Sequence, residues 1–154
     1  MSGDTTALAA DNAGGATKQP MGLRVLLADD QLAVRSALRL VLEQEPDVVV
    51  VGEVAEAARL LAEVTLSQPD LLLLDWELPG LPAADLLAAL QALCPGIQVV
   101  ALSGRPEARE PALKTGARAF VSKGDPPERL LAIIDDCRCD CQRARQDGSK
   151  PKAT

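Results

Sequence analysis

The stretch VLLADDQ, residues Val25–Gln31, places two adjacent aspartates directly after an apolar run. A run of this kind is typical of a buried strand. The carboxylates of Asp29 and Asp30 repel each other, which indicates that a cation meets them. Taken alone, the same pair is also typical of a helix N-cap and its neighbour. The rest of the sequence decides between a cation site and a simple cap.

Four further apolar runs follow along the chain, and helical periodicity fills the segments between them. Apolar runs without alternation are expected for strands that are covered on both faces. The segment after the first run has helical spacing in Val34, Leu38 and Val41. We therefore predict an α/β fold, a doubly wound five-stranded parallel sheet with helices on both faces. The predicted strands are Leu23–Ala28, Asp47–Val54, Asp70–Asp75, Ile97–Ser103 and Ala117–Ser122.

The last two predicted helices have distinctive beginnings. Pro111 lies where the fourth helix is expected, and proline costs about 3 kcal/mol in a helix interior but almost nothing in the first turn. This helix should therefore begin near Glu110, with GRPEARE as a loop before it. The fifth helix opens with DPPE, in which Asp125 suits the N-cap and Pro126 the first helical position.

The composition limits the classes of function. The chain has 154 residues, of which 47% are hydrophobic and 25% charged, and its formal net charge is −6. This balance suits one globular domain and disfavours direct DNA binding. No apolar run approaches the ~20 residues of a membrane span, and the N-terminus lacks the pattern of a signal peptide. We expect a cytoplasmic protein without membrane insertion.

The periodic pattern occupies only part of the chain. Residues 1–21 are predicted to be a disordered N-terminal tail, with Met21 as a candidate start of translation. The globular domain is predicted over residues 22–141, followed by a polar C-terminal tail over residues 142–154. No segment after the fifth helix is long enough for an output domain. We therefore expect the protein to act by docking, unless the chain is part of a longer one.

Polar side chains stand at the ends of four predicted strands. Asp29 and Asp30 follow the first strand, Asp75 ends the third, Ser103 ends the fourth and Lys123 follows the fifth. Ligands bind beyond the carboxyl ends of parallel strands, so these side chains should share one crevice. Three carboxylates together favour a hard divalent cation such as Mg²⁺. Beside such an ion, Asp75 can act as a nucleophile toward a phosphoryl group whose oxygens Lys123 and Ser103 hold.

At these residues the chain resembles the receiver domain of two-component response regulators, which has a CheY-like, flavodoxin-like fold of five βα units. The resemblance rests on LLADDQ, LLLLDWELPG, ALSG and GARAFVSK in the family's order, and it spans about residues 22–138. The last segment is most similar to receivers that precede a helix-turn-helix domain. The site residues implied by the resemblance are the metal ligands Asp29, Asp30, Asp75 and Glu77 (backbone carbonyl), the phosphoacceptor Asp75, and the phosphate-binding or switch residues Ser103, Lys123 and Phe120.

The resemblance implies a role in signalling. Receivers accept a phosphoryl group from a sensor histidine kinase, and partners read the surface of the fourth helix, fifth strand and fifth helix. We expect a single-domain response regulator that is not a conventional enzyme but supports its own Mg²⁺-dependent phosphorylation and dephosphorylation. Its output protein is unknown, and an apolar patch on either of the last two helices would support a homodimer.

Two other functions stay open. One is a constitutive interaction adaptor that has a receiver fold and does not depend on phosphorylation. The other is an aspartyl-phosphate phosphatase or phosphotransferase of another α/β family, although the DxD arrangement of such enzymes is missing here.

Three positions depart from the usual pattern of the family. Phe120 lacks the hydroxyl of the more frequent tyrosine, so its ring should favour burial. Glu77 and Arg105 lie two residues after Asp75 and Ser103, respectively. We expect them to form an ion pair over the site that modulates the phosphoryl lifetime, or else to remain separate solvated charges.

The four cysteines are expected to be reduced thiols. Cys137 and Cys141 share the apolar face of the last helix with Leu130 and Ile134, whereas Cys139 points elsewhere. Core packing is therefore expected for the first two. A zinc site, a redox role or a disulfide between chains would need local unwinding or a second chain.

Overall fold

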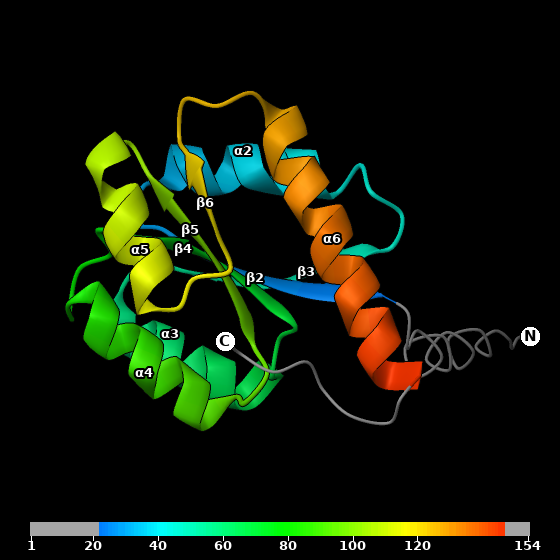
Figure 1. Ribbon diagram of the computed structural model, residues 1–154, viewed down its shortest axis with the longest axis horizontal. Coiled ribbons are helices and arrows are strands. Elements are labelled where there is room, and N and C mark those ends of the chain that lie inside the picture. Colours follow the sequence, from blue (N-terminus) through cyan, green and yellow to red (C-terminus); the bar gives the residue numbers. More distant parts are fainter. Residues whose placement is uncertain (1–21, 147–154) are drawn as a thin grey trace, which may run out of the picture.

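The computed structural model describes residues 22–146, in which five strands form one parallel sheet with helices on both faces (Figure 1). The strand order is β3-β2-β4-β5-β6, which confirms the predicted doubly wound fold. The elements in chain order are β2 (Leu23–Ala28), α2 (Leu32–Leu42), β3 (Val48–Val54), α3 (Ala57–Ser67), β4 (Leu71–Asp75), α4 (Ala83–Leu93), β5 (Gln98–Ser103), the 3₁₀ turn η1 (Pro106–Ala108), α5 (Arg109–Thr115), β6 (Ala119–Ser122) and α6 (Pro127–Gln146).

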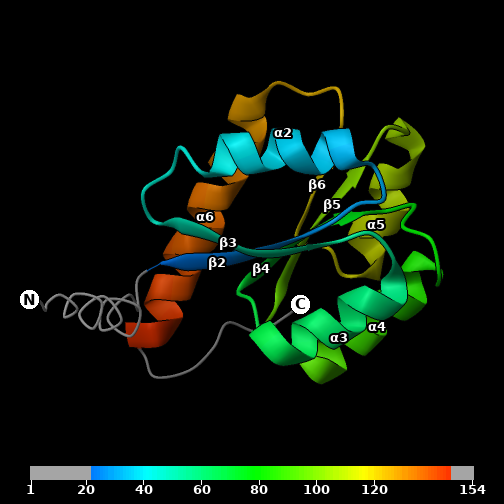
Figure 2. The same cartoon turned by 180° about the vertical axis from the view of Figure 1, so that it is seen from behind.

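Two helical layers enclose the sheet. Helices α2 and α6 cover one face, and α3, α4 and α5 cover the other (Figures 1 and 2). The central strand β4 is apolar up to its last residue, Asp75, which is typical of a strand with both faces covered. Leu72 and Leu74 pack beneath α3 and α4, whereas Leu71 and Leu73 pack beneath α2 and α6. All four side chains are fully buried, so β4 forms the centre of the core.

The position of β2 in the sheet creates the crevice that holds the site. β2 pairs with β3 on one side and with β4 on the other. The chain leaves β2 toward α2 on one face and leaves β4 toward α4 on the opposite face (Figure 1). The loops after β2 and β4 therefore diverge, and an opening forms beyond their carboxyl ends, where doubly wound folds bind ligands.

The region around Pro111 largely agrees with the prediction. α5 begins at Arg109, so Pro111 lies in its first turn, where the missing N–H is not needed. The preceding segment is not wholly a loop, because Pro106–Ala108 forms a 3₁₀ turn. The Ala108 N–H donates to the Arg105 carbonyl at 3.0 Å. Pro106 at the first position presets the backbone angle that such a turn requires.

The start of α6 differs from the prediction. The helix begins at Pro127 rather than Pro126, and the Asp125 carboxylate accepts a hydrogen bond from the Ser122 N–H at 3.0 Å. With Asp125 as the N-cap, the second helical position would be Pro127, so one of the two N–H donors that the cap could serve is missing. The Asp125 side chain therefore turns back toward β6 and stabilises the connection instead.

The end of α6 lies within the predicted polar tail. The helix continues through Gln146, past the expected domain end at Cys141, so the first part of the predicted polar tail is helical. Ion pairs between neighbouring turns, such as Arg143 with Asp140 at 3.1 Å, support this extension. The predicted N-terminal tail and residues 147–154 lie outside the described residues.

The cysteines of α6 lie as their helical spacing predicts. Cys137 and Cys141 are buried against the sheet and Cys139 is exposed. Burial raises the pKa of the Cys137 thiol to about 12, so this thiol stays protonated at neutral pH. No cysteine of residues 22–146 belongs to a group that could hold a metal ion. In the same part of the chain, every helix is too short or too polar to cross a bilayer.

Candidate functional site

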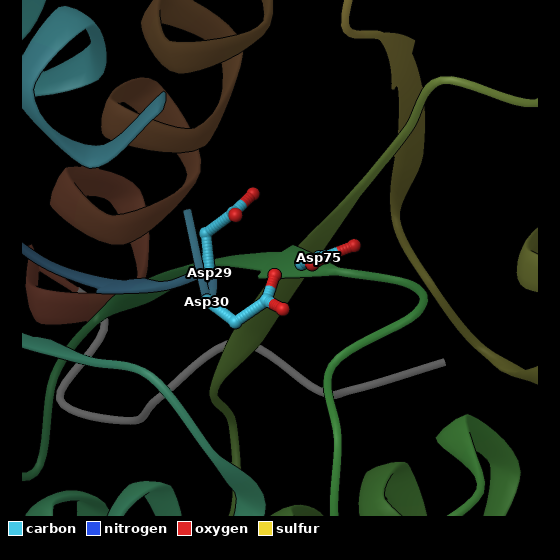
Figure 3. A group of neighbouring side chains, drawn as sticks. All are labelled: Asp29, Asp30 and Asp75. Carbon is cyan, nitrogen blue, oxygen red and sulfur yellow. The ribbon is translucent and has the colours of Figure 1, made fainter. Parts of the chain in front are cut away.

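Three aspartates meet at the carboxyl ends of β2 and β4 (Figure 3). Asp29 and Asp75 are buried, whereas Asp30 is exposed at the rim. One carboxylate oxygen from each of the three lies within 4.8 Å of the other two. The open crevice around them measures about 380 Å³ and is lined by Asp30, Gln31, Asp75, Glu77, Gly104, Arg105 and Lys123.

The two buried carboxylates are oriented by the loops that follow them. Asp29 Oδ1 accepts a hydrogen bond from the Gln31 N–H at 2.9 Å, and Asp75 Oδ1 accepts one from the Glu77 N–H at 2.9 Å. In both cases the carboxylate binds the backbone two residues ahead, as in an Asx-turn. Asp29 Oδ2 is also buried, and its partner is the Lys123 ammonium rather than a backbone N–H. The pair in VLLADDQ is thus not a helix cap, and the buried Asp29 meets a cation, as its sequence context predicts.

Lys123 brings a positive charge to this cluster from the end of β6. Its Nζ forms an ion pair with Asp29 Oδ2 at 2.8 Å and a longer one with Asp75 Oδ1 at 3.5 Å. The Lys123 N–H donates to the Ser103 carbonyl at 2.9 Å, which continues the pairing of β5 and β6. Burial acts to lower the pKa of Lys123, but the Asp29 and Asp75 carboxylates outweigh it and raise this pKa above its usual value. Lys123 therefore stays charged in the site.

The charge balance at Asp75 is unfavourable. Burial is the main cause that raises the pKa of Asp75, and the negative charges of Asp29 and Glu77 raise it further. The Glu77 N–H and the Lys123 ammonium act in the opposite direction without cancelling the rise. A further cation among these carboxylates would relieve the repulsion.

The structure does not contain the predicted ion pair between Glu77 and Arg105. Instead, the buried Ser103 hydroxyl donates to the Glu77 carboxylate, with both carboxylate oxygens 3.0 Å from Oγ. The Arg105 side chain is 66% exposed and faces Glu107 at 3.6 Å. The reason is that Ser103 lies beside the end of β4 and needs an acceptor for its buried proton, whereas Arg105 can be satisfied by water.

Phe120 is buried, as its missing hydroxyl predicts. The ring packs in a cluster of alanines, Ala101, Ala108, Ala112 and Ala117, with the partly buried Trp76 and Leu113 against it. In the structure the ring is inside while the Ser103 hydroxyl is bonded to Glu77. Burial of Phe120 therefore coexists with a Ser103 hydroxyl that is bonded to Glu77.

Comparison with known proteins identifies the family. A family profile described as the response regulator receiver domain matches residues 25–135. The chain belongs to this family. Receiver domains are signalling domains, and the receiver fold expected from the resemblance is confirmed.

Relatives and solved structures of this receiver domain agree with that assignment. The nitrate/nitrite response regulator NarL of Escherichia coli (strain K12) is 33% identical over 112 residues, which are 71% of this chain and 52% of that protein. The receiver domain thus spans about half the length of the curated relatives that it matches. The signal receiver domain of a NarL response regulator from Mycobacterium tuberculosis superimposes with a TM-score of 0.70 at 28% identity, covering 77% of this chain and 97% of that one. A CheY-like receiver domain protein from Methanospirillum hungatei gives 0.66 at 28% identity, covering 77% and 94%.

The receiver domain contains an ionic contact that the sequence did not predict. Arg35, which the helical pattern places on the polar side of α2, is only 17% exposed in its side chain. Its Nη1 donates to the Asp29 carbonyl at 2.7 Å, and its Nε donates to Glu53 at 2.9 Å. Glu53 also accepts a hydrogen bond from Arg39 at 2.6 Å. The charged Glu53 within the apolar strand VVVVGEV was the available signal, because a charge in such a strand needs a partner.

Replacing Glu53 by glutamine should destabilise the receiver domain by about 1 kcal/mol at neutral pH. The hydrogen bond from Arg39 is the main cause that holds the pKa of Glu53 below its usual value, and Arg35 adds to it. Since the folded-state pKa is the lower one, this stabilisation is complete above the unfolded-state pKa and disappears as the pH falls through the folded value, below about pH 4. Urea unfolding of Glu53→Gln and the parent at pH 7 and pH 3 measures the difference. Glu107→Gln, at an exposed pair, is the control, and an equal loss at both pH values would contradict the prediction.

Proposed function

We propose that this receiver domain accepts a phosphoryl group on Asp75 from a sensor histidine kinase, in a Mg²⁺-dependent reaction, and passes the signal on through protein contacts. The proposal is carried by one observation. Three carboxylates, the ammonium of Lys123 and the buried hydroxyl of Ser103 meet at the carboxyl ends of four neighbouring strands. Carboxylate, ammonium and hydroxyl are the groups that phosphoryl transfer to an aspartate requires.

The donor set suits Mg²⁺. The oxygens of Asp29, Asp30 and Asp75 lie close enough to share one ion, and the single ammonium of Lys123 does not balance their three charges. Mg²⁺ prefers such oxygen ligands and keeps several waters, which the exposed side of the crevice allows. We assign these three residues and the backbone carbonyl of Glu77 as its ligands. When bound, the ion supplies positive charge to the oxygens of the transferred group.

The remaining chemistry comes from the side chains of the domain. Asp75 Oδ1 is engaged by the Glu77 N–H and faces Lys123, so we assign the attack to Oδ2. A bond forms between this oxygen and phosphorus while the bond from phosphorus to the donor's imidazole nitrogen breaks. Lys123 neutralises one phosphoryl oxygen, and the Ser103 hydroxyl donates to another. Hydrolysis of the acyl phosphate by water returns the domain to its starting state.

We assign the output surface to α5, β6 and α6. Phe120 of β6 packs against residues of α5, so a change at Ser103 or Lys123 can reach this surface through a short path of contacts. The net charge of −6 supports a protein partner rather than direct DNA contact by this domain. The output protein is unknown, a homodimer through this surface is compatible with the proposal, and we assign the domain to the cytoplasm.

A constitutive adaptor is the second candidate function. It is favoured by the burial of Phe120 together with the bond between Ser103 and Glu77, because the ring occupies its inner position without any contact between Ser103 and Asp75. An adaptor of this kind would bind its partner equally well before and after substitution of Asp75.

The experiment that tests the proposed function uses the fluorescence of Trp76. It is the one tryptophan of a chain that has no tyrosine, and it lies between Asp75 and the cluster around Phe120. We expect a saturable change on addition of millimolar Mg²⁺ and a second one on addition of beryllofluoride. In Asp30→Ala the half-saturating Mg²⁺ concentration should rise about tenfold or more, because an exposed ligand is lost. A folded parent that shows neither change would overturn the proposal and favour the adaptor.

A further inference from the structure

We propose that Glu77 is a positioning residue that restrains the Ser103 hydroxyl and thereby lowers the affinity of the site for a phosphoryl group. The inference rests on the proposed function, since it concerns the same site. Both carboxylate oxygens of Glu77 lie 3.0 Å from Ser103 Oγ. A serine hydroxyl has one proton to donate. While this proton is held by Glu77, it cannot be given to a phosphoryl oxygen on Asp75.

The Ser103 hydroxyl is held from both sides. Its oxygen accepts a hydrogen bond from the Arg105 N–H at 3.0 Å, and its proton is directed to Glu77. The residue is 0% exposed, so with Glu77 in place water does not compete for the hydroxyl. A rotation of the hydroxyl toward Asp75 therefore exchanges one charged acceptor for another, instead of adding a new hydrogen bond.

Glu77 acts on the two functional residues in opposite ways. Its backbone N–H donates to Asp75 Oδ1 at 2.9 Å and stabilises the carboxylate in place. Its side chain, on the exposed rim of the crevice, turns to Ser103 and adds a negative charge where a phosphoryl group would enter. Removal of the carboxylate should thus help in two ways, by release of Ser103 and by loss of repulsion. Only the first depends on the hydroxyl of Ser103.

A double-mutant cycle separates these two effects. The variants are Glu77→Ala, Ser103→Ala and the double substitution, each titrated with beryllofluoride at saturating Mg²⁺ while Trp76 fluorescence is followed. We expect Glu77→Ala to lower the half-saturating concentration about fivefold, because an exposed carboxylate rehydrates and so holds the hydroxyl only moderately. In the Ser103→Ala background the same substitution should change it about twofold or less. Equal changes in both backgrounds, or none, would overturn the inference.

Glu107→Ala is the matched control. Glu107 pairs with Arg105, which lines the crevice, and is 71% exposed in its side chain, whereas Ser103 donates to Glu77. Glu107→Ala removes the same charge without releasing Ser103, so its half-saturating concentration should stay within about twofold of that of the parent. A fivefold gain in this control would assign the effect to net charge and would count against the restraint.

A second readout does not depend on phosphoryl chemistry. Hydrogen exchange of the Arg105 amide, which donates to Ser103 Oγ, should be several-fold faster in Glu77→Ala than in the parent with no phosphodonor present. Unchanged exchange would overturn the restraint. A parent that fails to respond to beryllofluoride overturns the proposed function and with it this inference, whereas a parent that responds without coupling between Glu77 and Ser103 overturns the inference alone.

Discussion

Asp75→Asn should abolish phosphoryl acceptance completely and, without Mg²⁺, should raise the stability of the fold by about 1–2 kcal/mol at pH 7. The first effect follows because an amide oxygen is too weak a nucleophile to form an acyl phosphate. The second follows from burial, which is the main cause that raises the pKa of Asp75, with the charges of Asp29 and Glu77 adding to it. The ionised carboxylate therefore destabilises the folded state at neutral pH.

The direction of the stability change in Asp75→Asn follows from the raised pKa of Asp75 in the folded state. A carboxyl group whose pKa is higher in the folded state favours folding when it is protonated, and this advantage is lost as the pH rises through the folded-state pKa. At pH 7 the parent carries the full penalty and Asp75→Asn carries none. Below about pH 4 the Asp75 carboxyl group of the parent is neutral, so the difference in stability between the parent and Asp75→Asn should shrink. Thermal unfolding of the parent and Asp75→Asn at pH 7 and at pH 3 measures this difference in stability.

Asp136→Asn supplies the control for Asp75→Asn, because Asp136 is exposed on α6. It should leave both the melting temperature and phosphorylation by a small phosphodonor unchanged. Incorporation of phosphate into Asp75→Asn, detected by mass spectrometry, would refute the assignment of the phosphoacceptor. A lower melting temperature for Asp75→Asn would show that the carboxylate stabilises the metal-free fold.

Lys123→Ala should affect Mg²⁺ binding and phosphorylation in opposite directions. The ammonium lies 2.8 Å from Asp29 Oδ2, closer than its 3.5 Å to Asp75 Oδ1, so it occupies the side of the cluster where we place the metal ion. Its removal should lower the half-saturating Mg²⁺ concentration several-fold, because the competing cation is gone. Phosphorylation should fall about a hundredfold or more, because the charge that neutralises a phosphoryl oxygen is lost.

Trp76 fluorescence during Mg²⁺ titration and the rate of phosphorylation by acetyl phosphate measure the two effects separately. Lys114→Ala is the control, since Lys114 is 74% exposed on α5 and pairs only with the exposed Glu110 among the ion pairs of the described residues. Weaker Mg²⁺ binding in Lys123→Ala would show that the lysine orients the carboxylates rather than competing for them. Phosphorylation at the rate of the parent would remove Lys123 from the proposed site.

The parts of the site that stand on strand ends could be predicted from the sequence. Asp29, Asp75, Ser103 and Lys123 each lie at or directly after the end of an apolar run, and the parallel order of the strands brings such ends together. The strand alone determines where these short side chains begin, and Lys123 is long enough to reach the others. The positions of these four residues could therefore be predicted from the strand ends and the parallel direction of the strands alone.

Contacts of side chains on loops and bulges could not be predicted in this way. Glu53 faces Arg35 partly because the register of β2 and β3 shifts between Val25 and Leu26, so that Leu27 lies opposite Glu53. A shift of one residue changes which face of the sheet a side chain meets, and no pattern in the sequence marks this one. The Arg105 side chain is likewise exposed. Ion pairs with Glu107 and with Glu77 would therefore differ little in free energy, and the sequence does not show which of them forms.

The start of α6 shows a third kind of limit. Asp125 has the right chemistry for a cap, but the outcome depended on which of two consecutive prolines begins the helix. In the structure the Asp125 carboxylate accepts from the Ser122 N–H and pairs with Arg129 at 3.3 Å, so it does not cap the helix. Local propensity indicates that a helix begins here, whereas tertiary contacts select the residue.

The alanine packing around Phe120 has a consequence for local unfolding. α5 has only seven residues, and its inner contacts to the ring come largely from methyl groups, whereas α3 and α4 are held by buried leucines. Each methyl group buries little apolar area, so α5 and η1 should separate from the sheet at a lower free energy than the rest of the domain. Helix α5, which is part of the surface that we assign to partner recognition, is thus less costly to remodel than α3 or α4. A partner can gain affinity by reshaping this segment, at little cost to the leucine core.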